Sequence, residues 1–168
     1  MKNQKNQKTF SDIFGDPNVF EREKYKYYIQ NNDSALDLKE KTRKIVTEKS
    51  LGSVMNDTKW LKLQNAIEKL PFAPPYIEKL IFEDKTFEEV QISDNPDWLG
   101  DWSPFYQEGM SLFFAIEYIK VRPRYAEHQG RLTVPKVIDE TKEFIQLLKE
   151  LYIPYEEDNG TFIIYGYK

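Results

Sequence analysis

Hydrophobic residues recur at helical spacing in two stretches of the chain. The first stretch places its apolar residues three, four and three positions apart, at Trp60, Leu63, Ile67 and Leu70. The second keeps a similar period from Val137 to Leu151. Spacing of this kind predicts amphipathic helices that bury one face. Pro71 ends the first helix, and Pro135 suits the first turn of the second.

Short runs rich in β-branched and aromatic residues predict strands between these helices. Residues 76–82 and 87–92 are separated by four polar residues, 83–86, and we expect them to pair as a hairpin. Residues 112–122 form the longest such run and predict a central strand.

The chain ends with the clearest turn signal in the sequence. Residues 152–157 and 161–167 flank Asp158-Asn159-Gly160. Asn-Gly favours a type I′ turn, because both residues tolerate a positive φ, so a closing hairpin is predicted. The order of elements predicts an α+β fold, a single domain with a largely antiparallel sheet, packing helices and an N-terminal helical extension.

The first third of the chain is more polar than the rest. Helices are predicted over about residues 18–30 and 34–49, the second with only a thin apolar stripe, and Gly52-Ser53 is typical of a linker. We therefore divide the chain into an N-terminal helical extension, residues 1–54, and an α+β domain, residues 55–168. The domain is expected to fold by itself. The extension is expected to pack on it, because polar helices of this length are marginal alone.

Composition excludes several classes of site. The chain has no cysteine and a single histidine, His128. Disulfide frameworks, thiolate metal sites and cysteine nucleophiles are therefore excluded, and one histidine is too few for the usual zinc hydrolase site. No apolar run approaches the roughly 18 residues of a membrane span, and residues 1–9 lack the apolar region of a secretory signal. These features predict a soluble, cytoplasmic protein without a cofactor or a membrane partner.

Negative charge is concentrated in one stretch, residues 83–108, which we call the acidic segment. It holds eight carboxylates and one lysine, a net charge of −7, whereas the whole chain carries only −4. Its centre repeats an Asp-Trp pair, at Asp97-Trp98 and Asp101-Trp102. Prolines and a glycine around these pairs predict an irregular loop.

The acidic segment is interpreted first as a recognition surface for a basic protein. Carboxylates of one sign steer an oppositely charged partner, and aromatic side chains are the usual anchors of an interface. The candidate partner-binding residues are Asp94, Asp97, Trp98, Asp101, Trp102, Tyr106 and Glu108. The competing interpretation is that both tryptophans fill the core while the carboxylates are merely solvated. The two interpretations are compatible if only one tryptophan is buried.

Carboxylates also suit a Mg²⁺ or Ca²⁺ site. Pro96-Asp97 followed by Glu117 and Lys120 is similar to a magnesium nuclease pattern. Two residues separate Glu117 from Lys120 where that pattern has one, so the two side chains are predicted on opposite faces of a strand.

A basic group follows the central strand. Lys120, Arg122 and Arg124 alternate along the chain and are predicted to share one face. Such a face could contact nucleic acid, but the low isoelectric point, about 5.2, favours an internal ion-pair network with the acidic segment. A nucleic-acid partner is therefore not expected, and His128 is expected on the surface.

Several short stretches after residue 55 resemble a family of small uncharacterised bacterial proteins. They include Trp98 to Trp102, Glu108-Gly109, Ile116 to Ile119, Gly130 to Leu132 and Ile164 to Tyr167. The resemblance covers residues 55–168, and some such acidic families are similar to immunity proteins of bacterial toxin systems. It implies a compact, acidic, non-catalytic protein.

The leading hypothesis is a non-enzymatic binding protein of the immunity or antitoxin type. Its acidic segment would neutralise a basic effector, such as a toxin or nuclease domain. One alternative is a Mg-dependent enzyme acting on nucleic acid or nucleotide through Asp97, Glu117 and Lys120. A second alternative is a structural or regulatory subunit that self-associates through its N-terminal helices. The oligomeric state is left open.

Overall fold

A computed structural model describes residues 10–15 and 20–168. The N-terminal tail, residues 1–9, and residues 16–19, which include the start of the first predicted helix, lie outside this described part.

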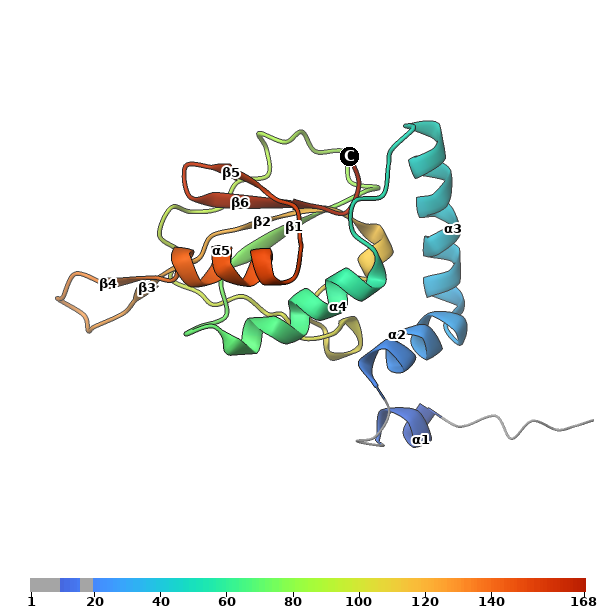
Figure 1. Ribbon diagram of the computed structural model, residues 1–168, viewed down its shortest axis with the longest axis horizontal. Helices are drawn as coiled ribbons and strands as arrows, with labels where there is room; N and C mark the ends of the chain where they lie inside the picture. The colour runs from blue at the N-terminus through green and yellow to red at the C-terminus, as the bar shows by residue number, and fades with distance from the viewer. Residues whose placement is uncertain (1–9, 16–19) are drawn as a thin grey trace, which may run out of the picture.

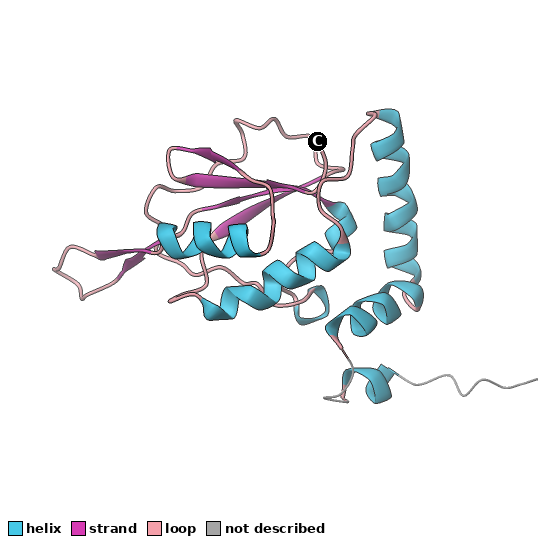
Figure 2. Ribbon diagram, in the orientation of Figure 1, coloured by secondary structure: helices cyan, strands magenta, loops and turns pink. Residues whose placement is uncertain are grey.

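The described chain forms the predicted α+β fold, with helices and an antiparallel sheet (Figures 1 and 2). The helices are α1 (Phe10–Phe14), α2 (Glu21–Gln30), α3 (Asp33–Glu48), α4 (Asp57–Ala66) and α5 (Thr141–Glu150). The strands are β1 (Tyr76–Leu80), β2 (Ile116–Val121), β3 (Arg124–Glu127), β4 (Lys136–Asp139), β5 (Glu156–Asp158) and β6 (Thr161–Tyr165). The main sheet has the order β1-β2-β6-β5 with antiparallel neighbours, and β3 and β4 form a separate hairpin.

Helices α4 and α5 cover one face of the main sheet (Figure 1). The apolar faces predicted from helical spacing are buried there, with Trp60, Leu63, Phe144 and Leu148 almost inaccessible. Strand β2 is central, as predicted, but it begins at Ile116 after a short 3₁₀ turn. The closing hairpin is also confirmed, with positive φ at Asn159 and Gly160.

Two predicted boundaries are wrong. The helical pattern from Val137 overestimates α5, because residues 136–139 pair with β3 as strand β4. The hairpin of residues 76–82 with 87–92 does not form, since β1 pairs with β2 and residues 87–92 are a turn and loop. Phe87 and Val90, three residues apart, face the same side of that turn and pack on the sheet, which strand alternation would not allow.

The N-terminal helices pack on the rest of the chain, as predicted. The Tyr25 ring stacks on Phe113 with centroids 4.7 Å apart, and its hydroxyl accepts the Phe113 N–H at 2.9 Å. Ile29 and Ala35 are buried in the same core cluster. The N-terminal helices thus share a core with residues 55–168, and independent folding of those residues stays a prediction.

The β3–β4 hairpin projects from the body as an arm (Figure 1). Its tip exposes Leu132 and Val134 fully or nearly so, and His128 is on the surface as predicted. None of the described helices is both long enough and apolar enough to cross a membrane.

Glu140, immediately before α5, is a buried carboxyl group with incomplete hydrogen bonding. One oxygen accepts the Phe72 N–H at 3.2 Å, and the other has no partner. Burial, supplemented by the nearby Glu143 and Asp139, raises the pKa of Glu140 to about 7. The protonated acid is therefore the form that suits this site.

We predict that Glu140→Gln removes a pH dependence of stability. The folded-state pKa of about 7 exceeds the ordinary value of 4.5, so protonated Glu140 contributes fully below about pH 4.5, and this contribution is lost as the pH rises through 7. The variant should match the native chain in acid and exceed its unfolding free energy by roughly 2–3 kcal/mol at about pH 8. Urea unfolding at about pH 5 and pH 8 measures this, with the exposed Glu48→Gln as control. An equal difference at both pH values would contradict the prediction.

Candidate functional site

The first half of the acidic segment covers the second face of the main sheet, opposite α4 and α5, whereas its far end, residues 102–107, lies beside α4. Figure 1 shows its first half as the yellow-green chain on that side. Val90 is buried there and forms a small apolar cluster with Tyr118 and Ile163, separate from the main core. The segment is thus held on the sheet although it has no strand or α-helix of its own.

Lys120 fixes the first half of the acidic segment. Its ammonium group donates to the carbonyl oxygens of Phe87 and Val90, both at 2.7 Å, and lies 3.5 Å from the centre of the Phe87 ring. The residue is buried on strand β2, and this burial lowers the pKa of Lys120. Two carbonyls and one aromatic face therefore replace the water that a lysine normally holds.

Arg122, two residues further on, fixes the middle of the segment. Its Nε donates to the Asp94 carbonyl at 2.7 Å, and Nη1 donates to the Asn159 carbonyl. The Asp94 carboxylate is 3.7 Å from the guanidinium. The predicted internal use of these cations is thus found, but most of their bonds go to main-chain carbonyls. Arg124 does not share their face: it starts β3 and pairs with Asp139 at 2.8 Å.

Trp102 holds the far end of the segment in the core. It is 6% exposed, its Nε1 donates to the Pro74 carbonyl at 2.9 Å, and its ring contacts Tyr76. The prediction of Trp102 as an anchor for a partner is therefore corrected, because a buried indole cannot reach one. Trp98 is 39% exposed and keeps that role open. One buried and one exposed tryptophan is the arrangement in which both interpretations hold.

Tyr106 also has contacts within the chain. Its hydroxyl donates to the Glu21 carboxylate at 2.7 Å, and the Phe14 ring contacts it edge-on at 4.7 Å. The N-terminal helices therefore half-cover this predicted anchor. Glu108 is exposed two residues later, in a turn where its φ is +63°.

The carboxylates of the segment differ in how they are bonded. The carboxylates of Glu83, Glu89 and Asp101 accept local hydrogen bonds from the main-chain N–H groups of residues 80, 86 and 103, respectively. In the described part of the chain, four others have no hydrogen bond or ion pair: Asp84, Glu88, Asp97 and Glu108. All four are exposed, so their charge acts outward into solvent.

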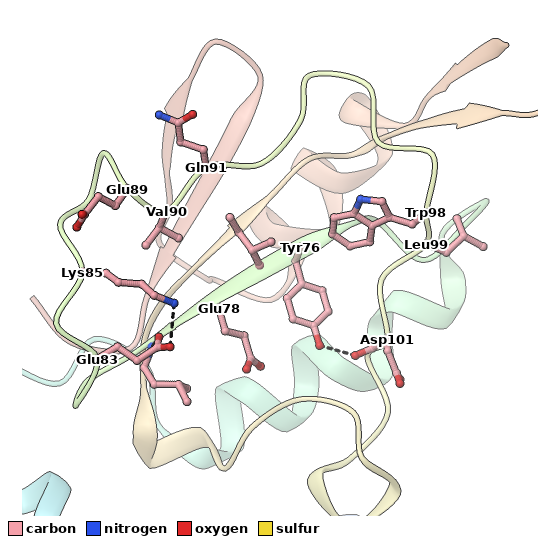
Figure 3. Close-up of a pocket in the computed structure, with 12 residues that line it drawn as sticks. Tyr76, Glu78, Glu83, Lys85, Glu89, Val90, Gln91, Trp98, Leu99 and Asp101 are labelled. Carbon is pink, nitrogen blue, oxygen red and sulfur yellow. Dashed lines mark hydrogen bonds and ion pairs between the residues drawn. The ribbon is translucent and has the colours of Figure 1, made fainter.

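A groove of about 660 Å³ opens between two parts of the acidic segment (Figure 3). Its floor is strand β1, including Tyr76 and Glu78. One wall is formed by residues 83–91, and the other contains Trp98, Leu99 and Asp101. We call this the edge groove, because β1 is one of the two outermost strands of the main sheet.

The edge groove carries an excess of negative charge. Four carboxylates line it, from Glu78, Glu83, Glu89 and Asp101, against one lysine. That lysine, Lys85, is already paired with Glu83 at 3.0 Å. Glu78 accepts the N–H and hydroxyl of Ser111, and burial raises its pKa. The groove thus combines acidic side chains with the exposed apolar surface of Trp98 and Leu99.

Two of the three residues of the magnesium alternative already have partners within the chain. Glu117 forms an ion pair with Lys79, and Lys120 is saturated by carbonyl oxygens. Asp97 is exposed on the acidic segment. Among the described residues, no group of three carboxylate or histidine side chains is placed to hold a metal ion.

Sequence reasoning missed the contribution of β1 to the site. Local patterns assign no role to Tyr76 and Glu78, because the run 87–92 predicts a strand that would pair with β1 and cover its edge. The glutamates at 88 and 89 were a signal against that pairing, since consecutive charges suit a turn better than a strand with one buried face.

We predict that Lys120→Met releases the first half of the acidic segment. The side chain keeps its length, but the carbonyls of Phe87 and Val90 lose their donor, which is expected to cost about 3 kcal/mol of unfolding free energy. Hydrogen exchange should accelerate at residues 87–90. The exposed Lys142→Met is the matched control. Native exchange rates at 87–90 in the Lys120 variant would show that the ammonium does not hold the segment.

The two tryptophans should respond oppositely to truncation. Trp102→Ala removes a buried indole and its hydrogen bond, so we expect a loss of roughly 3–5 kcal/mol of unfolding free energy. Trp98→Ala removes a part-exposed ring and should cost about 1 kcal/mol or less. Urea unfolding of both variants measures this. Similar large losses would make Trp98 part of the scaffold and remove it from the candidate surface.

Comparison with known proteins places the chain in a family. Residues 42–168, about three quarters of the chain, match a family of unknown function, DUF6678. The match begins within α3 and includes the sheet, the acidic segment and α5. No curated protein and no solved structure gives a significant match. The resemblance to an uncharacterised family is thus confirmed, over a stretch that begins at residue 42 and not at the predicted residue 55, and nothing in the comparisons links the family to immunity proteins. The chain belongs to the family of unknown function DUF6678.

Proposed function

We propose that this chain is a non-enzymatic binding protein that captures a basic partner protein on the acidic segment. The observation that carries the proposal is that interior cations hold the backbone of that segment and leave most of its carboxylates free. Buried Lys120 and Arg122 hold its backbone, while carboxylates such as Asp97 and Glu108 stay exposed and unpaired. A surface fixed in advance loses little conformational entropy when a partner binds.

The charge of the segment supports a basic partner. Surface carboxylates without internal counter-ions raise the association rate of a positively charged protein, and the effect weakens as salt screens them. Trp98 and Leu99 lie among these charges, 39% and 49% exposed, and offer the apolar contact that charge alone lacks.

The most concrete form of this function is an immunity-type inhibitor of a bacterial effector. The effector would be a basic toxin or nuclease domain whose substrate-binding surface the carboxylates occlude, in place of phosphate groups. A cytoplasmic location follows from such a role, since the inhibitor must meet the effector where its target is. The direct test is co-expression with the product of an adjacent toxin-like gene: the chain should restore growth and form a complex with that product.

Neutralising two free carboxylates should slow capture of that partner. Asp97→Asn with Glu108→Gln is expected to lower the association rate several-fold at low salt and by less at high salt, with no change in unfolding free energy. Stopped-flow or surface-based kinetics at two salt concentrations measure this. Glu23→Gln with Glu48→Gln removes the same charge from α2 and α3 and serves as control. An equal effect of both pairs would mean that total charge, and not the acidic segment, governs capture.

A further inference from the structure

Strand β1 is an unpaired edge of the main sheet. It pairs with β2 on one side and, among the described strands, with none on the other. Strand edges carry main-chain donors and acceptors that a further strand can use, and proteins normally cover or shorten them.

The register shows which main-chain groups of β1 are free. The Arg122 N–H donates to the Pro75 carbonyl, and Ile77 lies opposite Lys120, so the odd-numbered residues bond to β2. The N–H and C=O groups of Tyr76 and Glu78 therefore point away from the sheet. None of these four groups has a hydrogen-bond partner in the described structure.

Both ends of this free stretch are closed by the chain itself. At one end, the Glu83 carboxylate accepts the Leu80 N–H at 2.8 Å, and the Glu83 main-chain N–H donates to the Leu80 carbonyl at 3.0 Å. At the other end, the Gly100 N–H donates to the Ala73 carbonyl at 3.1 Å. Pairing is thus possible only over Tyr76 to Glu78, inside the edge groove (Figure 3).

The walls of the edge groove indicate the chemistry of the occupant. An added strand would run between Glu89 on one wall and Asp101 on the other, over Glu78, and would meet Leu99 and Trp98. Lysine or arginine side chains complement the carboxylates, and small β-branched residues complement the apolar surface.

We propose that the partner donates an extended segment, with basic and apolar residues in alternation, which adds to the free edge of β1 as a further strand. This inference rests on the proposed function and specifies how the partner is bound. Main-chain bonds to Tyr76 and Glu78 fix the segment, and the carboxylates of the edge groove select its charge.

Two other occupants are less suited to the groove. A second copy pairing through its own β1 would bring the same carboxylates together without counter-ions. The chain's own residues 1–9 carry three lysines, but polar Asn and Gln separate them, and they contain no valine or isoleucine to suit Leu99 and Trp98.

The test uses a synthetic, capped seven-residue peptide of alternating lysine and valine with the full-length chain. Two further versions carry N-methyl groups on every second residue, one on the lysines and one on the valines, so that charge is retained but one set of N–H donors is lost. Only one set can face β1. We expect one methylated peptide to bind roughly tenfold more weakly, as the loss of two main-chain hydrogen bonds implies, and the other to bind within about threefold of the parent.

Amide exchange supplies the second readout. The parent peptide should slow exchange at Tyr76 and Glu78 and leave the α5 amides unchanged. Leu99→Lys, which places a positive charge in the edge groove, should weaken the peptide about tenfold, whereas Leu132→Lys on the projecting arm should not. A glutamate-valine peptide should not bind.

Each contrary result has a distinct meaning. If both methylated peptides bind like the parent, the acidic surface attracts cations without strand addition, which overturns this inference and leaves the proposed function intact. If the parent peptide does not bind at millimolar concentration, the inference is also wrong, and the co-expression test still judges the function. If Tyr76 and Glu78 are already protected in the full chain and become exposed on removal of residues 1–9, the occupant is the chain's own tail and not a partner.

Discussion

The hydrogen bonds from the Lys120 ammonium to the carbonyls of Phe87 and Val90 are the contacts on which the proposed binding surface depends. A buried ammonium must find partners, because its desolvation would otherwise cost several kcal/mol. Here it finds them in the main chain of a segment whose side chains are mostly acidic. Arg122 repeats the arrangement at Asp94 and Asn159. Because these cations bond mainly to carbonyl oxygens, they hold the segment without neutralising most of its carboxylates.

This arrangement explains how an irregular segment can be well positioned. Residues 83–108 form no strand of their own, yet three contacts fix them. Val90 is buried on the sheet, the Asp94 carbonyl accepts a hydrogen bond from Arg122, and the Trp102 indole N–H donates to the Pro74 carbonyl. Between the fixed points the chain bulges outward and carries Asp97 and Trp98 to the surface. The two tryptophans of the repeated Asp-Trp pair therefore differ: Trp102 is buried and holds the segment on the core, whereas Trp98 is exposed.

The sequence predicts those parts of the fold that local patterns determine. Helix α4 follows from its apolar spacing and the closing hairpin from Asn159-Gly160, because a buried face and a positive φ are properties of a few neighbouring residues. The failed pairing of residues 87–92 with β1 has a different origin. Phe87 and Val90 are apolar enough for a strand, and only their contacts with Tyr118 and Lys120, some thirty residues away, select the turn.

The candidate site shows the same limit. The acidic charge and the exposed Trp98 could be anticipated from composition and from the loop residues around them. The burial of Trp102 could not be anticipated, because both tryptophans stand in identical dipeptides and differ only in the residues on which they pack. The edge groove was also beyond local reasoning, since an open strand edge is a property of the whole sheet order.

The separation between buried cations and unpaired surface carboxylates has a consequence for divergence within the family. Asp84, Glu88, Asp97 and Glu108 make no internal bond in the described chain, so exchanging or moving them changes the surface field at little cost to folding. Lys120 and Arg122 lack that freedom, because each satisfies main-chain groups that no other side chain reaches. In relatives that share these residues, the four surface positions can change while Lys120 and Arg122 keep the backbone of the acidic segment in place. The residues that hold the backbone therefore differ from those that set the surface charge, and the surface charge can change without disturbing the fold.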